Sequence, residues 1–297
     1  MTSGLSRRQI GTMLIHWSVS PEIYEIGPVR LRWYGLMFLT GFAIGYQLMR
    51  EVCIKENKPV EKLESLLIYL VLATMIGARL GHCLFYDPGH FLSHPLDILK
   101  VYEGGLASHG GGLGVITALI LFSRRNPEFS MWWLLDRISI FTVMTGSLIR
   151  IGNLMNSEIL GKPTDGTWGV IFERIDQIPR HPAMIYESIC YALIFALTYT
   201  LYRRWRARAP NGLLFGMVVG LIMTCRFFIE FFKEVQEPFE RGMVLNMGQL
   251  LSLPFIAVSL YLVVRGIRLL RAGETGEPKD APKKSMNRGS RAGRRRR

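Results

Sequence analysis

Charge is scarce along most of this sequence. Charged residues make up 20% of the 297, while hydrophobic residues make up 49%; soluble domains usually carry about 25% charged residues, spread along the whole chain. Here long stretches have almost none. This composition excludes a disordered chain, and it argues strongly against a soluble globular protein.

Paired cysteines are also lacking. The four cysteines fall singly along the chain, with no CxxC pair and no Cys/His spacing typical of zinc. We therefore expect neither a disulfide framework nor a metal site. The amino terminus has only a short apolar stretch and no small-residue cleavage site, so it does not resemble a removed signal peptide.

The positive charge is mostly terminal. The net charge is +13, and residues 272–297 carry nine basic residues against three acidic ones, without any apolar pattern. We interpret this segment as a disordered basic tail beside anionic lipid headgroups. Nucleic-acid binding is the alternative, and the concentration of the charge in one tail disfavours it.

Seven stretches are apolar enough to be candidates for transmembrane helices, which need about 20 apolar residues. They are residues 31–49, 66–85, 109–122, 132–149, 183–202, 212–232 and 247–264. The sequence thus predicts an all-α, polytopic membrane protein whose single integral-membrane domain covers residues 1–271. No internal repeat at a fixed period is present.

The basic residues of the connections predict the orientation. The first, third and fifth connections and the tail are basic, whereas residues 86–108 contain one lysine beside three acidic residues. By the positive-inside rule, the odd connections and the carboxyl terminus are cytoplasmic and the amino terminus lies outside. The long connection 150–182 then lies outside too, and its Trp168, Ile171 and Phe172 indicate partial packing.

Several polar or ionisable residues fall within or beside these stretches, where they are costly and usually face the protein interior. They are Arg79, His109, Arg150, Asn153, Asn156, Glu158, His181, Glu187, Arg226 and Glu230.

Helical spacing brings some of these residues together. Arg226 and Glu230 are four apart and can pair on one helix face, as can Arg150 and Asn153, three apart. His109 begins its stretch at the outer side, where Arg150 and Asn153 end theirs. Together they indicate a site for an anionic headgroup. The alternatives are a structural ion pair, a packing histidine and an Arg79 that snorkels or bonds a carbonyl.

Seven motifs appear in an order that resembles one known family. They are RWYGLMFLTGF, GARLGHCLFYDP, EGGLASHGGGLG, GSLIRIGNLMNSEILG, RHPAMIYE, CRFFIEFFKE and NMGQLLSLP. The series is similar to the prolipoprotein diacylglyceryl transferase family over roughly residues 28–265. In the RIGNxxNxE signature, Ser157 stands where a glycine is usual.

The resemblance implies an enzyme of the bacterial inner membrane, with its active site toward the outer face. Such enzymes move the diacylglyceryl group of phosphatidylglycerol onto the thiol of the lipobox cysteine in the signal peptide of a prolipoprotein. A thioether forms and glycerol 1-phosphate departs. The resemblance implies neither a metal nor an organic cofactor, and it implies no nucleic-acid partner.

The resemblance also implies roles for individual residues. Arg150 and Arg226 match arginines that stabilise the phosphate, Glu230 matches an acidic partner of the second arginine, and His109 matches a candidate base or orienting donor. The remaining matches imply roles in substrate binding or support, and they are Tyr34, Arg79, Gly104, Asn153, Asn156, Glu158 and Gly161.

Two other classes of function are consistent with charges inside a membrane. In a transporter or flippase for anionic lipids, the same charges would line a pathway, but no paired repeats with interrupted helices are seen. In a membrane scaffold, the charges would form structural ion pairs. A scaffold would not require a histidine and two arginines at matched depth, so this alternative is disfavoured.

Overall fold

The computed structural model describes residues 13–26, 29–86, 88–100, 105, 107–234 and 242–274, and its body is helical. Within these ranges the long helices are α1 (Trp33–Lys55), α2 (Leu63–Phe85), α4 (Ser108–Arg125), α5 (Met131–Asn156), α6 (Ala183–Trp205), α7 (Leu213–Ile229) and α8 (Met247–Arg271). Each of the seven predicted stretches coincides with one of them. Five (α2, α5, α6, α7 and α8) lie in segments long and apolar enough to cross a membrane.

Two small sheets lie outside the helices, so the all-α prediction holds for the helical body and not for its connections. The strands are β1 (Met13–Trp17), β2 (Glu22–Ile26), β3 (Val29–Arg32), β4 (Trp168–Phe172) and β5 (Pro179–Arg180). β4 pairs with β1 in parallel and with β5 in antiparallel register, and β2 and β3 form a hairpin that leads directly into α1. The expected partial packing of the long connection is confirmed for Ile171 and Phe172, which are buried, whereas Trp168 is exposed.

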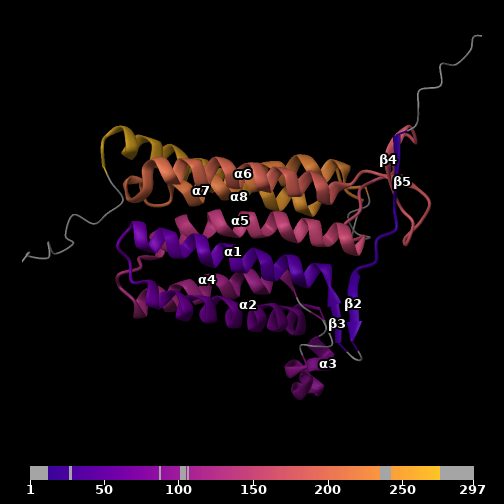
Figure 1. The fold of residues 1–297 in the computed structure, drawn as a ribbon, viewed down its shortest axis with the longest axis horizontal. Helices are drawn as coiled ribbons and strands as arrows, with labels where there is room; N and C mark the ends of the chain where they lie inside the picture. The colour runs from indigo at the N-terminus through magenta and orange to yellow at the C-terminus, as the bar shows by residue number, and fades with distance from the viewer. Residues whose placement is uncertain are drawn as a thin grey trace, which may run out of the picture.

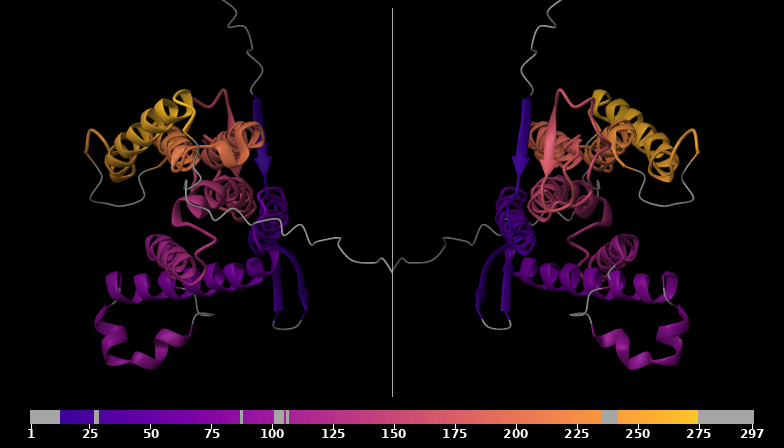
Figure 2. Two further views of the ribbon diagram at one scale, coloured as in Figure 1. Left: turned by 90° about the vertical axis from the view of Figure 1, so that its left-hand side faces the viewer. Right: turned by 90° about the vertical axis from the view of Figure 1, so that its right-hand side faces the viewer.

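The long helices form three groups. In Figures 1 and 2, α1 and α5 lie between the group of α6, α7 and α8 on one side and the pair α2 and α4 on the other. α2 and α4 approach closely through glycines: a Cβ added at Gly110 would lie 2.2 Å from the carbonyl oxygen of Gly77. Small residues at such a contact are typical of helix pairs in membranes.

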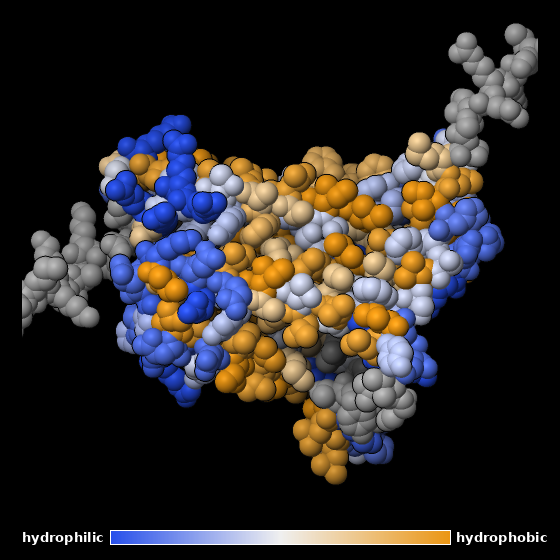
Figure 3. Space-filling view, viewed as in Figure 1, coloured by the Kyte–Doolittle hydropathy of each residue, from blue (hydrophilic) through white to orange (hydrophobic). Residues whose placement is uncertain are grey.

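The connections gather at two ends of the helical body. Figure 1 shows both sheets and the short helix α3 (Pro88–Ser93) at one end, with the start of α1 and the end of α5. The short turns η1 (Val60–Lys62) and η4 (Arg206–Arg208) lie at the other end. In Figure 3, hydrophilic side chains gather mainly at the two ends of this face, with a largely apolar band between them. The end with the sheets is called the sheet end below, and the other the basic end.

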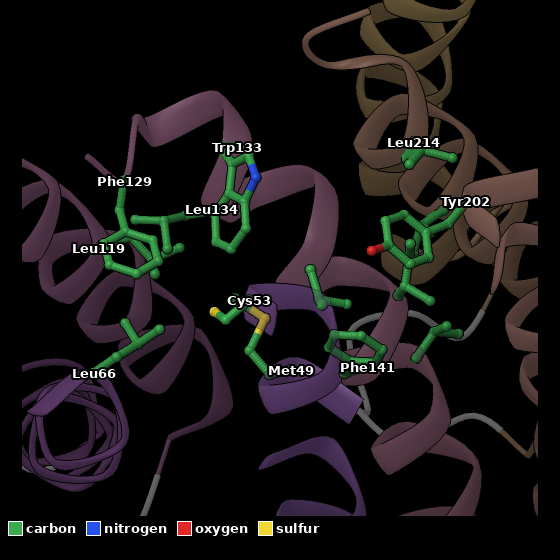
Figure 4. Packing of buried hydrophobic residues seen from close by; sticks show 14 of the residues in the cluster. Met49, Cys53, Leu66, Leu119, Phe129, Trp133, Leu134, Phe141, Tyr202 and Leu214 are labelled. Atoms are coloured by element: carbon green, nitrogen blue, oxygen red, sulfur yellow. The ribbon is translucent and has the colours of Figure 1, made fainter. Parts of the chain in front are cut away.

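The main hydrophobic core lies where α1, α2, α4, α5, α6 and α7 meet. Figure 4 shows side chains of this core, among them Cys53, Phe129, Leu134 and Tyr202. At the basic end this core also encloses charge: the Arg137 guanidinium lies 2.9 Å from the Glu56 carboxylate, and both side chains are 2% exposed. The Trp133 indole nitrogen donates to the same carboxylate at 2.6 Å. The pair ties the end of α1 to the start of α5.

Glu56→Ala is expected to lower the melting temperature of the purified protein, because it leaves the Arg137 charge buried without its nearest partner. Breaking a buried pair from one side typically costs about 3–5 kcal/mol. Glu51→Ala is the matched control, since Glu51 and Lys55 form an exposed i,i+4 pair on the same helix, worth about 0.3–0.5 kcal/mol. Equal melting temperatures for the two variants would contradict a structural role of the buried pair.

Candidate active site

The carboxyl end of α5 turns back on itself and brings three predicted residues together. Ser157 caps the helix in the left-handed conformation, with φ of 57°, and Ile159 has φ of 58°. Glycine is the residue best suited to such a cap, so Ser157 adopts the conformation that the usual glycine of the signature would favour. The turn places Glu158 where its two oxygens accept from Asn153 at 3.0 Å and from Asn156 at 3.1 Å.

Arg150 is held in place by contacts on two sides. Its Nε lies 2.6 Å from Oε2 of Glu187 on α6, and its Nη1 donates to Oδ1 of Asn153 at 3.0 Å. Glu187 is fully buried, whereas the Arg150 side chain remains 17% exposed. The guanidinium is therefore fixed in orientation and still within reach of a ligand.

Lys233 extends this arrangement into a network. Its ammonium lies 2.7 Å from Oε1 of Glu187 and 3.4 Å from Oε2 of Glu230, and its side chain is 4% exposed. Arg150, Glu187, Lys233 and Glu230 thus alternate in charge across α5, α6 and the turn η5 (Glu230–Phe232). Buried charges persist only when they are paired, so this network fixes the relative positions of the three elements.

The predicted pairing of Arg226 with Glu230 is wrong. Among the described residues no ion pair joins the two, and the partner of Glu230 is Lys233. The helical spacing itself is kept, because Glu230 has right-handed helical backbone angles and its N–H donates to the Arg226 carbonyl. The Glu230 carboxylate contacts Lys233 instead, at the end of the 3-10 turn that follows α7. Arg226 lies in the last turn of α7, half-buried.

Gly161 lies where the long connection between α5 and α6 meets η5. Its N–H donates to the carbonyl of His181 at 3.0 Å, and it forms a β-bridge with Lys233. Added at this glycine, a Cβ would lie 2.3 Å from the His181 oxygen and 2.8 Å from the Phe232 oxygen. Glycine is required here because the backbones on both sides leave no room for a side chain.

Arg180 holds this connection from β5. It lies 2.6 Å from Asp176 and 2.9 Å from Glu234, and it donates to the Gly161 carbonyl at 3.3 Å. Hydrogen bonding from the guanidinium lowers the pKa of the Asp176 carboxyl. The connection is thus a firmly packed part of the site and not a loose loop.

Tyr34 lies close to the same end of α5. A Cβ added at Gly152 would lie 3.1 Å from the Tyr34 Cα, so the first turn of α1 packs directly on the last turns of α5. Of the predicted binding residues, the structure therefore gathers Tyr34, Asn153, Asn156, Glu158 and Gly161 around Arg150.

Arg79 and His109 lie elsewhere. Arg79 is buried and donates to the carbonyls of Asp97, Ile98 and Gly105, so it holds the connection between α2 and α4 as in the carbonyl-bonding alternative. His109, in the first turn of α4, is exposed and lines a groove between α2 and α4. Within the described residues, no hydrogen bond or ion pair links it to the network. Gly104 lies outside the described residues.

Sequence reasoning gave no role to Glu187 or Lys233. A carboxylate inside an apolar helix marks Glu187 as a candidate functional residue. Its partners lie on other elements, so the sequence does not identify them. Lys233 follows Glu230 by three residues, a spacing at which the two can pair. Its place at the end of an apolar stretch is, however, typical of a lysine at the membrane interface.

The structure defines a helical protein with several membrane-length apolar helices and a buried network of charges at its sheet end. A family model described as "Prolipoprotein diacylglyceryl transferase" matches residues 21–265. The chain belongs to this family, and the resemblance found in its motifs is confirmed.

Close relatives support the same assignment. A phosphatidylglycerol–prolipoprotein diacylglyceryl transferase of Tolumonas auensis is 47% identical over 251 residues, which cover 84% of this chain and 97% of the relative. Proteins of the same name from Chloroherpeton thalassium and Bacteroides fragilis are 43% and 40% identical, over 88% and 84% of this chain and 97% and 94% of their own lengths.

Proposed function

We propose that this protein transfers the diacylglyceryl group of phosphatidylglycerol to the lipobox cysteine of prolipoproteins. The names of relatives that match along nearly their whole length support this activity. The observation that carries it structurally is the oriented, partly exposed Arg150 at the end of an apolar bundle. It suits a substrate with an anionic phosphate on an apolar body.

The reaction breaks one bond and forms another. The cysteine sulfur, as thiolate, attacks the carbon of the diacylglyceryl group that is bonded to the phosphate oxygen. As the new carbon–sulfur bond forms, the carbon–oxygen bond breaks, and its electron pair leaves on the oxygen of glycerol 1-phosphate. Negative charge therefore grows on the phosphate oxygens, and donors fixed before the reaction stabilise it most effectively.

Arg150 is the donor best prepared for this task. Glu187 and Asn153 hold its guanidinium, so little reorganisation is needed when charge develops on the phosphate. Arg226 supplies the second cation. Glu230 acts on the site through Lys233, with which it forms its ion pair. Tyr34, Asn156, Glu158 and Gly161 support this arrangement, Arg79 fixes the connection between α2 and α4, and Gly104 is proposed as a backbone contact.

His109 is proposed to take the proton of the thiol. His109→Ala is then expected to lower turnover near pH 7 by about a hundredfold, as removal of a general base typically does. The loss should shrink above a pH of about 8.5, where a cysteine thiol ionises unaided. The measurement is turnover of a lipobox peptide against pH. Wild-type turnover at every pH would show that the arginines activate the thiol without His109.

The site is proposed to face outward from the bacterial inner membrane, with seven spans and a cytoplasmic carboxyl terminus. The alternating basic connections support this orientation, as does the placement of both sheets at one end of the body. A reporter fused after Arg271 is expected to register as cytoplasmic, and one inserted in the loop 161–166 as external. Both reporters on one side would contradict seven spans.

One assay tests the proposed reaction. Purified protein is incubated with phosphatidylglycerol labelled in its diacylglyceryl part and with a lipobox peptide, and the peptide is examined for label. We expect a labelled thioether with the wild-type protein and none with a Cys→Ser peptide. Movement of lipid between leaflets without labelled peptide would instead indicate a flippase. If neither labelled peptide nor lipid movement is found, the protein is a scaffold.

A further inference from the structure

An apolar cavity of about 310 Å³ lies between α1, α2 and α5, with Val115 of α4 also in its lining. Its lining is almost entirely apolar, with threonines and one tyrosine as the only polar side chains among the described residues. Water would find few partners there, so the cavity suits an apolar occupant. The groove that contains His109 is separate, because it shares no lining residue with the cavity.

The cavity extends along the helices. It is lined on α1 from Phe38 to Met49 and on α5 from Ile138 to Ile149. Eleven residues of a helix span about 16 Å at 1.5 Å per residue. Half of a hydrocarbon core of about 30 Å is about 15 Å, the depth occupied by the acyl chains of one leaflet. The cavity thus has the length of one acyl chain.

The end of the cavity nearer the sheet end of the helical body, called its upper end here, adjoins the charged network. Gly146, which lines the cavity, lies four residues before Arg150 on the same face of α5, and Phe38 lies one turn after Tyr34 on α1. A lipid whose phosphate contacts Arg150 can therefore place an acyl chain directly into the cavity. This continuity argues for the lipid substrate as occupant and against an unrelated apolar ligand.

Its lower end is closed by the hydrophobic core. Met49, Leu63 and Leu66 line it and are 5%, 2% and 3% exposed. Figure 4 shows Met49 and Leu66 among the packed side chains of the core. Halfway down, Gly45 leaves space: a Cβ added there would meet only Phe141, at 3.7 Å. The core thus limits the depth of the cavity. The absence of a side chain at position 45 leaves the cavity open at half its depth.

We infer that this cavity binds one acyl chain of the phospholipid substrate and that its floor, formed by Met49, Leu63 and Leu66, limits the length of that chain. The inference rests on the proposed transferase function. It assigns acyl-chain selectivity to residues that take no part in the chemistry.

The test is an internal competition. The wild type and variants receive equal amounts of dioctanoyl, dipalmitoyl and diarachidoyl phosphatidylglycerol with one lipobox peptide, and mass spectrometry gives the ratio of the thioether products. Ratios within one reaction do not depend on the fraction of folded protein. Gly45→Leu narrows the cavity, and it should raise the ratio of dioctanoyl to dipalmitoyl product at least about tenfold, since a single methylene in an apolar site is worth roughly 10–200-fold.

Met49→Ala lowers the floor and should shift the ratio the other way, toward diarachidoyl product. Ala43→Leu and Ile44→Ala are the matched controls, because both positions are exposed on α1 and do not line the cavity; they should keep the wild-type ratios. Unchanged ratios in both Gly45→Leu and Met49→Ala would overturn the inference, and either variant decides it if the other does not fold. Absence of product from every lipid with the wild type would instead refute the proposed function.

Discussion

Arg150→Lys and Arg150→Gln are each expected to lower turnover of a lipobox peptide by about a hundred- to a thousandfold. Removal of one preorganised donor from a site of developing charge typically costs about 2.7–4 kcal/mol. Turnover should fall more than lipid binding weakens, because the charge on the phosphate grows only as the carbon–oxygen bond breaks.

Lysine should not restore activity, for a geometric reason. The Arg150 guanidinium contacts Glu187 through Nε and Asn153 through Nη1, and these contacts aim the group. A lysine has a single nitrogen on a flexible stem and cannot make both contacts while also donating to a phosphate. Arg124→Lys is the control, since Arg124 is exposed at the far end of α4. It should leave turnover unchanged.

Gly161→Ala is expected to lower turnover by about a hundredfold, the effect that a misplacement of about 1 Å can have on a preorganised site. The added methyl group would lie 2.3 Å from the His181 oxygen. Because backbone surrounds the position, η5 and the connection between α5 and α6 must move apart. Lys233, which forms a β-bridge with Gly161, would then move relative to Glu187.

The control for Gly161→Ala is Gly112→Ala in α4, where an added Cβ would meet no atom within 4 Å. This variant should keep wild-type turnover, because alanine favours a helix more than glycine does. Turnover is compared at equal amounts of folded protein. Wild-type turnover in Gly161→Ala would show that the backbone contacts at this position do not determine the geometry of the site.

The helices were predictable because their signal is strong and local. Stretches of about 20 apolar residues with basic ends identify a helix almost regardless of its neighbours. The strands gave no such signal: β4 has five residues, and β5 has two. Their pairing depends on β1, which lies more than 150 residues away from β4 in the sequence.

The site was predictable where its residues share one helix. Arg150 and Asn153 follow helical spacing, and the structure joins them by a hydrogen bond. The pairing of Arg226 with Glu230 was wrong although their spacing is helical, because the ion-pair partner of Glu230 is Lys233, which follows the turn η5. Glu187 and Lys233 meet only through the packing of α5, α6 and η5, which no local spacing encodes.

The match covers nearly the whole length of the relatives, so residues throughout the chain, and not the site alone, establish the family. The structure adds how the charges are held. Glu187 is the common partner of Arg150 and Lys233, and it determines how a guanidinium can be both fixed and accessible in an apolar bundle.

The most direct test of this account measures both turnover and phosphatidylglycerol affinity for Arg150→Lys, Arg226→Lys and the wild type in nanodiscs. The account predicts that each lysine variant loses turnover by about a hundred- to a thousandfold, while its affinity for the lipid changes by much less. Near-normal turnover in both variants would contradict it, because neither arginine would then stabilise the leaving phosphate.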